Sequence, residues 1–224
     1  MTDGIGLPLG VELDDGTPLR LRLGTTDDRD ALAAGFGRLS PESRIARFFT
    51  GMPRLSSLFL DRLLDLDESR HVAIVAEDMS RMSDVDDQTK GLGIGVARYI
   101  TSNTDATQAE MAIAVIDEYH GRGIGHLLLD ALVDHAVRNG ITTGTATVLS
   151  DNSKMLRLLT SMGATPRQDP DDRTVMTVEI PLGADHGRRS LLHTMLSLVA
   201  TGDDSSSREP DGVGEGTAES RPVD

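Results

Sequence analysis

The sequence predicts an α+β fold with one mixed, mostly antiparallel sheet of six to seven strands and helices on both faces. Short β-branched and aliphatic runs alternate with longer segments whose apolar residues recur every three to four positions. The strand-like runs follow one another with helices inserted at defined points, which is typical of α+β architecture. The 224 residues, 38% of them hydrophobic, suffice for one sizeable core.

The chain divides into four segments by composition. Residues 1–16 are rich in Gly, Asp and Pro without a sustained period, and are expected to form a flexible lead-in. A single domain is expected over 17–182. It is followed by an amphipathic helix over 183–200. Residues 201–224 are acidic, lack core-forming side chains and are expected to be disordered.

The first part of the domain is expected to hold one strand and three helices. Alternation predicts the strand over 17–23. Thr25, followed by two aspartates, is suited to cap a helix. Ser40 and Pro41 offer a cap and a proline at the first helical position. A third, short helix is expected to begin at Ser56 or its neighbour.

The second part reads as five strands and two helices. The strands are predicted over 71–77, 94–100, 108–116, 142–149 and 173–180, and the helices over 123–138 and 151–162. Gly140 and Gly163 follow the two helices as C-terminal stops.

Composition excludes several classes of function. The chain has no cysteine, so disulfides, thiolate zinc sites and cysteine nucleophiles are excluded. The six histidines show no i, i+4 pair, and no metal site is expected. The net charge of −14 argues against nucleic acid or an anionic membrane as partner. Without a spanning apolar stretch or a signal peptide, the protein is expected to be cytoplasmic.

A glycine-rich loop between a strand and a helix is the main candidate for a binding site. From His120 to Gly125 it reads His-Gly-Arg-Gly-Ile-Gly. Glycines let the backbone turn tightly and approach a ligand, and the first N–H groups of the next helix are unpaired. Together with the helix dipole they predict an anion site, to which Arg122 adds a charge. The alternative is an ordinary tight turn.

Other readings of the glycines are less favourable. The run at 91–95 leads into a strand, so no helix start with unpaired N–H groups follows it. It is expected to be only the start of that strand. The loop at 120–125 lacks both the Gly-Lys-Ser/Thr of a P-loop and the G-x-G-x-x-G order of dinucleotide-binding folds.

This loop, with Val115, Asn152 and Met162-Gly163, resembles the acetyl-CoA motif of the GNAT acetyltransferase superfamily, Q/R-x-x-G-x-G/A, with His120 replacing Gln or Arg. The resemblance spans roughly 17–181 and is most specific over 108–163. It implies the GNAT fold, acetyl-CoA as cosubstrate and no metal. The strand backbone would hold pantetheine and the loop amides the pyrophosphate. The implied cofactor-binding residues are Ile113, Ala114, Val115, Gly121, Arg122, Gly123, Ile124, Gly125, His126 and Asn152. Asn152 is equally suited to cap a helix.

A narrower resemblance lies upstream. The segment 39–49, with Val96-Ala-Arg-Tyr99 and Glu110-Met-Ala, is similar to the acetyltransferase module of bacterial Pat-type protein lysine acetyltransferases. Many of those proteins add a cyclic-nucleotide-binding or acyl-CoA-synthetase-like domain, which is not expected in 224 residues. The resemblance implies a protein lysine as acceptor. Arg44 and Arg47 are read either as ligand contacts or as solvated or structural cations.

Glu110 is the candidate general base. A lysine ammonium is deprotonated at neutral pH only at a cost of roughly 4.6 kcal/mol, so a group must accept its proton. Strand alternation places Glu110 with Ala112 and Ala114 on one face, leaving space beside the carboxylate. The GNAT resemblance also implies a basic glutamate at this point. The alternative is a solvent-facing glutamate on a strand.

A general acid is not evident. Many GNAT relatives carry a tyrosine seven residues after the position of Asn152, where this chain has Leu159. Tyr99 and Tyr119 are the only tyrosines and are read as packing or loop residues. A thiolate is a tolerable leaving group, so the lack of an acid need not abolish activity.

The sequence therefore predicts an acyl-CoA-dependent N-acetyltransferase that transfers acetyl from acetyl-CoA to a primary amine. A protein lysine ε-amine is the leading acceptor. The alternatives are a small amine, a protein N-terminus, or a non-catalytic module that binds acyl-CoA for regulation. A homodimer is compatible with the sequence.

Overall fold

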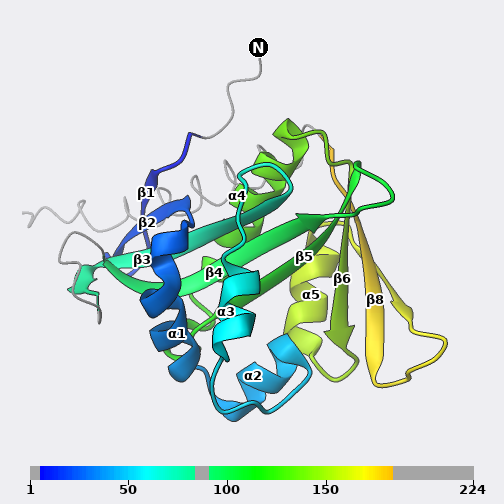
Figure 1. Cartoon of the computed structure of the whole chain (residues 1–224), viewed down its shortest axis with the longest axis horizontal. Helices are drawn as coiled ribbons and strands as arrows, with labels where there is room; N and C mark the ends of the chain where they lie inside the picture. The colour runs from blue at the N-terminus through cyan, green and yellow to red at the C-terminus, as the bar shows by residue number, and fades with distance from the viewer. Residues whose placement is uncertain (1–5, 84–90, 184–224) are drawn as a thin grey trace, which may run out of the picture.

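The computed structural model describes residues 6–83 and 91–183. Its elements are shown in Figure 1 and are, in chain order, β1 (Leu9–Glu12), β2 (Pro18–Leu23), η1 (Thr26–Asp28), α1 (Arg29–Gly37), α2 (Pro41–Phe48), α3 (Ser57–Leu63), β3 (His71–Met82), β4 (Gly91–Thr101), β5 (Gln108–Val115), η2 (Asp117–Tyr119), α4 (Ile124–Arg138), β6 (Thr143–Leu149), α5 (Ser153–Ser161), β7 (Thr165–Gln168) and β8 (Val175–Pro181). The helix predicted over 183–200 and the tail over 201–224 lie outside the described residues, apart from Gly183.

One sheet runs through the described chain in the order β1-β2-β3-β4-β5-β6-β8-β7. All neighbouring strands are antiparallel except β5 and β6, which pair in parallel. The predicted α+β class and mixed, mostly antiparallel sheet are confirmed. The number of strands is eight rather than six to seven.

The two strands that the sequence did not reveal lie at the two edges of the sheet. β1 occupies part of the segment expected to be a flexible lead-in, so that prediction is wrong for Leu9–Glu12. Its alternation extends over only four residues, too few to register as a period. β7 contains Pro166, which argues against a central strand but is tolerated at an edge, where its missing N–H breaks no ladder.

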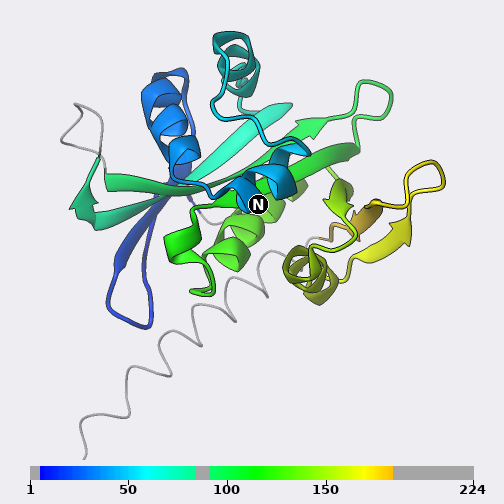
Figure 2. The same ribbon diagram turned by 90° about the horizontal axis from the view of Figure 1, so that it is seen from below.

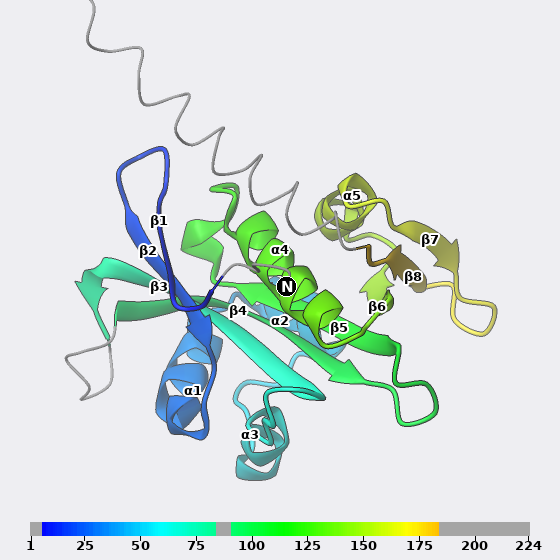
Figure 3. The same cartoon turned by 90° about the horizontal axis from the view of Figure 1, so that it is seen from above.

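Helices cover both faces of the sheet, as predicted. α4 packs on β3, β4 and β5, whereas α1 packs on β4 from the opposite side. Figures 2 and 3 show α1 and α3 on one side of the sheet and α4 on the other. α2 contacts β5 and β6. The fully buried core includes Leu21, Ile74, Ile94, Leu128 and Leu132.

Local capping explains where the first helices begin. The Ser40 hydroxyl accepts a hydrogen bond from the Ser43 N–H at 3.1 Å, and Pro41 occupies the first turn of α2. At α3 the Ser56 hydroxyl accepts from the Phe59 N–H at 3.2 Å. These contacts satisfy amides that a helix start leaves unpaired, so both predicted starts are confirmed.

The glycine run at 91–95 belongs to β4, as the sequence predicted. A Cβ at Gly95 would lie 2.9 Å from Cδ1 of Leu128 on α4, so a larger residue there would force this contact to shift. Within 6–83 and 91–183, no helix is long and apolar enough to cross a membrane. Over the same ranges, no three His, Asp or Glu side chains cluster as a metal site would require.

Candidate acetyl-CoA cleft and acceptor site

The sheet forks between β5 and β6, and Glu110 lies at the fork. β5 pairs with β4 from Ala109 to Val115, but its parallel pairing with β6 ends at Glu110 and Thr145. Figure 1 shows the two strands meeting at one end and diverging toward the other. The second half of β5 therefore has one edge without a neighbouring strand.

The register of β5 decides which backbone groups face this opening. The Ile116 N–H donates to the carbonyl of Ile94 on β4 at 2.9 Å. Because the direction alternates along an antiparallel ladder, Ile113 and Val115 direct their N–H and C=O groups toward the opening. Ala114 directs its backbone toward β4 and lines the cleft with its side chain. The Val115 carbonyl also lies 2.8 Å from Nε2 of His120.

The loop before α4 has the geometry of an anion site. Gly121 and Gly123 have φ of +78° and +80°, conformations that other residues adopt at a cost. The His126 N–H donates to the Gly123 carbonyl at 3.0 Å, so the unpaired amides at the start of α4 are those that precede His126. These amides and the helix dipole favour an anion at this end of α4.

One cleft of about 800 Å³ unites most of the predicted cofactor residues. It lies between α2, the free edge of β5, the loop and α5. Nine of the ten predicted residues line it, and these are Ile113, Ala114, Val115, Gly121, Gly123, Ile124, Gly125, His126 and Asn152. The shape and amide-rich end suit a long ligand that carries phosphate.

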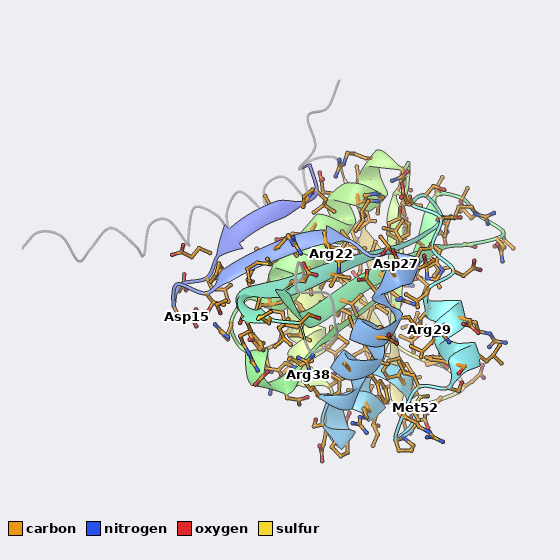
Figure 4. All side chains as sticks on the ribbon, turned by 60° about the vertical axis from the view of Figure 1, so that its left-hand side comes forward. Asp15, Arg22, Asp27, Arg29, Arg38 and Met52 are labelled. Atoms are coloured by element: carbon orange, nitrogen blue, oxygen red, sulfur yellow. The ribbon has the colours of Figure 1, made fainter. Side chains whose placement is uncertain are left out.

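Arg122 is the predicted cofactor residue that does not line the cleft. Its guanidinium donates to the Asp15 carboxylate and, at 2.7 Å, to the Thr17 hydroxyl, and lies 4.8 Å from the ring centre of Tyr119. Figure 4 shows Asp15 in the turn between β1 and β2. Arg122 therefore ties this hairpin to the loop.

Lys154 and Arg157 are cations in the cleft that the sequence analysis missed. Both side chains are exposed and line the cleft from α5. Their spacing of three residues places them on one helical face, which was a usable signal. They offer positive charge to phosphate groups where Arg122 does not.

Asn152 serves as a helix cap, which is one of the two roles predicted for it. Its Oδ1 accepts a hydrogen bond from the Met155 N–H at 3.1 Å and so caps α5. The residue also lines both the cleft and the adjoining pocket that contains Glu110.

The pocket around Glu110 adjoins the cleft. The Glu110 side chain is exposed and shares this pocket with Arg47 and Phe49 of the α2 region and with Leu159 of α5. Burial lowers the pKa of Arg47, and the carboxylate of Glu110 partly counteracts this effect. Leu159 is buried and supplies no proton.

Neither tyrosine replaces the missing acid. The Tyr99 hydroxyl donates to the Ser69 carbonyl at 3.0 Å, and burial raises the pKa of Tyr99 to about 12. The Tyr119 hydroxyl donates to the Asp78 carboxylate at 2.6 Å. Both tyrosines are thus structural residues, as predicted.

The two arginines of α2 have different roles. Arg44 donates to the carbonyls of Pro53 and Gly37 and lies over the Phe36 ring, which is a structural arrangement. Arg47 lines the cleft, the pocket of Glu110 and a third, apolar cavity.

Comparison with known proteins agrees with this geometry. The family model of an acetyltransferase (GNAT) domain matches residues 19–165. An acetyltransferase of Pseudomonas aeruginosa is 31% identical over 162 residues, which are 72% of this chain and 83% of that protein. Acetyltransferase Pat of Mycolicibacterium smegmatis is 30% identical over 78% of this chain, which spans about half (49%) of Pat.

Among solved structures, the crystal structure of the GNAT domain of S. lividans PAT is similar in fold and sequence. It is 29% identical with a TM-score of 0.67, and the match covers 78% of this chain and 96% of that domain. The eight-stranded sheet described above is thus a GNAT fold.

Proposed function

The chain belongs to the GNAT family of acetyl-CoA-dependent N-acetyltransferases, and on this basis we propose that its acceptor is a protein lysine ε-amine and that Glu110 takes the proton. The observation that carries the proposal is the position of Glu110 at the fork of β5 and β6, in a pocket that adjoins the cleft. The Pat-like segment of α2 supports a protein substrate.

Different parts of the cleft bind different parts of acetyl-CoA. The amides before His126 receive the pyrophosphate, with Lys154 and Arg157 supplying positive charge. The free edge of β5 pairs with pantetheine through Ile113 and Val115. Acetyl-CoA supplies a thioester whose carbonyl carbon accepts the nucleophile.

Glu110 makes the amine nucleophilic. Its carboxylate accepts one proton from the lysine ammonium, directly or through water, and the neutral nitrogen attacks the thioester carbonyl. The new C–N bond forms as the C–S bond breaks. The nitrogen then gives up its second proton, which neutralises the thiolate. Because a thiol has a pKa near 8.5, the thiolate is stable enough to leave without a general acid, which Leu159 could not provide.

The test compares Glu110→Gln with wild type. The variant keeps the size and polarity of the side chain but cannot accept the proton. We expect kcat to fall by about 10²- to 10⁴-fold, the usual contribution of a general base, while calorimetric affinity for acetyl-CoA stays the same. Glu179→Gln, on the exposed face of β8, is the matched control. Equal turnover by Glu110→Gln and wild type removes Glu110 from the mechanism.

The acceptor class is tested separately. Acetyl-CoA and the wild-type protein are incubated with a bacterial lysate and with a panel of small amines. New acetyl-lysine on proteins supports the proposal. Acetylation of small amines alone favours a small-amine acetyltransferase, and binding of acetyl-CoA without any transfer favours a regulatory module.

A further inference from the structure

A buried arginine on β4 has an unused hydrogen-bond donor. Arg98 is 6% exposed, and its Nη2 donates to the Leu63 carbonyl at 2.7 Å. Its Nη1 is buried and has no hydrogen-bond partner among the described residues. Burial, and then the charge of Arg47, lower the pKa of Arg98 to about 10. A buried charged donor without a hydrogen-bond partner lowers the stability of the fold, and a bound anion would remove this cost.

A second cation lies nearby without a bonded counter-ion. The guanidinium of Arg47 lies 4.9 Å from the ring centre of Phe48, and within the described chain it forms no ion pair at 4 Å or less. Its effect on the pKa of Arg98 means that the two positive charges repel each other. An anion between them would relieve this repulsion.

Both arginines line an apolar cavity of about 90 Å³ between the sheet and α1 to α3. The two acidic side chains that line this cavity, Glu77 and Asp28, already form ion pairs with other arginines. Glu77 binds Arg20 at 2.7 Å and Arg22 at 2.8 Å, and Asp28 also binds Arg22. Figure 4 shows Arg22 on β2 beside the start of α1.

The sheet register relates Arg98 to the proposed base. Arg98 pairs with Ala112, and Ile100 pairs with Glu110. Arg98 and Glu110 are thus diagonal neighbours on one face, with a spacing of about 7–8 Å between such positions. This face points toward α1 to α3, whereas the edge suited to pantetheine points toward β6.

We propose that Arg98 and Arg47 bind a carboxylate carried by the amine acceptor. The inference rests on the proposed function, in which the amine lies beside Glu110. A guanidinium binds a carboxylate through two parallel hydrogen bonds, and the contact is stronger in a desolvated site. The acceptor therefore presents its amine to Glu110 and its carboxylate to the two arginines at the same time.

Two sources provide this chemistry. One is the α-carboxylate of a free amino acid, and the other is an acidic side chain next to the target lysine in a protein. Two matched pairs of acceptors separate them. L-lysine is compared with cadaverine, which lacks the carboxylate, and a lysine peptide with Glu beside the lysine is compared with the same peptide carrying Gln.

The experiment measures kcat/KM for all four acceptors at saturating acetyl-CoA. For wild type we expect the carboxylate member of at least one pair to be preferred by about tenfold or more, as for one charge-assisted contact. In Arg98→Met and Arg47→Met the ratio should fall toward one. Arg173→Met, an exposed arginine between β7 and β8, is the control and should keep the wild-type ratio.

Arg98→Lys provides a second variant should Arg98→Met fail to fold. It keeps the charge but loses the two-pronged geometry, and should lower the ratio partially. A ratio near one in wild type for both pairs, or an unchanged ratio in both Arg98 variants, overturns the proposal. If wild type and the Arg98 variants still acetylate the acceptors and Glu110→Gln does not, the proposed function holds and only the carboxylate site is overturned.

The acyl donor is the remaining source of a carboxylate. Succinyl-CoA and butyryl-CoA are compared with cadaverine as acceptor. Equal use of both donors supports the acceptor assignment. A preference for succinyl-CoA that Arg98→Met abolishes assigns the carboxylate to the donor and overturns it. Failure of wild type to acetylate any amine, in this panel or in a lysate, overturns both proposals.

Discussion

Ser40 donates two hydrogen bonds to Asp117, one from its backbone N–H and one from its hydroxyl, each at 2.8 Å. The Ser43 hydroxyl donates to the same carboxylate at 2.8 Å. Burial by itself raises the pKa of Asp117, but these hydrogen bonds hold it below its usual value. Asp117 stands just before the glycine loop, so it links the start of α2 to that loop.

Asp117→Ala is expected to lower the free energy of unfolding by about 1–3 kcal/mol, because the Ser40 N–H loses its acceptor. The KM for acetyl-CoA should rise as well, since α2 and the loop lose their link. Urea denaturation and steady-state kinetics measure the two effects. Asp151→Ala, an exposed aspartate, is the control and should change stability by less than about 0.5 kcal/mol. Equal stability of the two variants would show that the link contributes nothing.

The double variant Lys154→Gln with Arg157→Gln is expected to weaken acetyl-CoA binding by about tenfold, because it removes charge-assisted contacts to phosphate. Its affinity should also depend less on salt. Arg122→Gln should change the affinity by less than about threefold, since Arg122 is engaged by Asp15. Calorimetry at two salt concentrations measures both. A larger loss in Arg122→Gln than in the double variant would mean that Arg122 leaves Asp15 to bind phosphate.

Gly123→Ala is expected to lower stability by about 1–2 kcal/mol, because φ of +80° is strained for a residue with a Cβ. Gly123→Asn should cost less, since asparagine tolerates this region and suits a helix N-cap. Gly37→Ala, in open space on α1, is the control and should stabilise the protein by up to about 1 kcal/mol. Denaturant midpoints measure the series. The reverse order, with asparagine worse than alanine, would contradict the backbone argument.

Stability should fall as the pH drops below about 6.5, the usual histidine pKa. Burial lowers the pKa of His71, His126 and His135, and the charge of Arg98 adds to the effect at His71. Between the lowered and the usual pKa, the unfolded chain binds more protons than the folded one, so protonation favours unfolding. The stabilising contribution is complete above about pH 6.5.

Urea midpoints at pH 7.5, 6.5 and 5.5 test this dependence. His71→Gln should show a weaker fall than wild type between pH 7.5 and 5.5. The aspartates with lowered pKa, such as Asp78 and Asp117, lose their contribution only as the pH falls through about 4 and below, outside this window. A midpoint that stays constant from pH 7.5 to 5.5 would contradict the prediction.

Local sequence predicted the central elements well because their signals lie within a few residues. Ser40 and Pro41 begin α2, and the glycines at 121 and 123 adopt positive φ before α4. In each case the signal is a side chain that bonds its own helix or a residue that lacks a Cβ. Such effects depend on neighbours in the chain and need no knowledge of the fold.

Other features followed from contacts between distant segments. The sequence predicts that Arg122 binds the cofactor, yet its partner Asp15 is 107 residues away along the chain. β7 is too short to show a period and exists through its pairing with β8. Lys154 and Arg157 line the cleft only because the fold places α5 at its border.

The sequence by itself determined the order of the central strands and helices, the glycine loop before α4 and the glutamate on β5, since periodicity, caps and glycines act over a few residues. The tertiary structure alone decided where the sheet forks, which cations face the cleft, and that Arg47 and Arg98 share a cavity in which no carboxylate of the described residues is bonded to either. These properties arise from desolvation and from pairing across the sheet, where the energy depends on distance in space and not on separation along the chain.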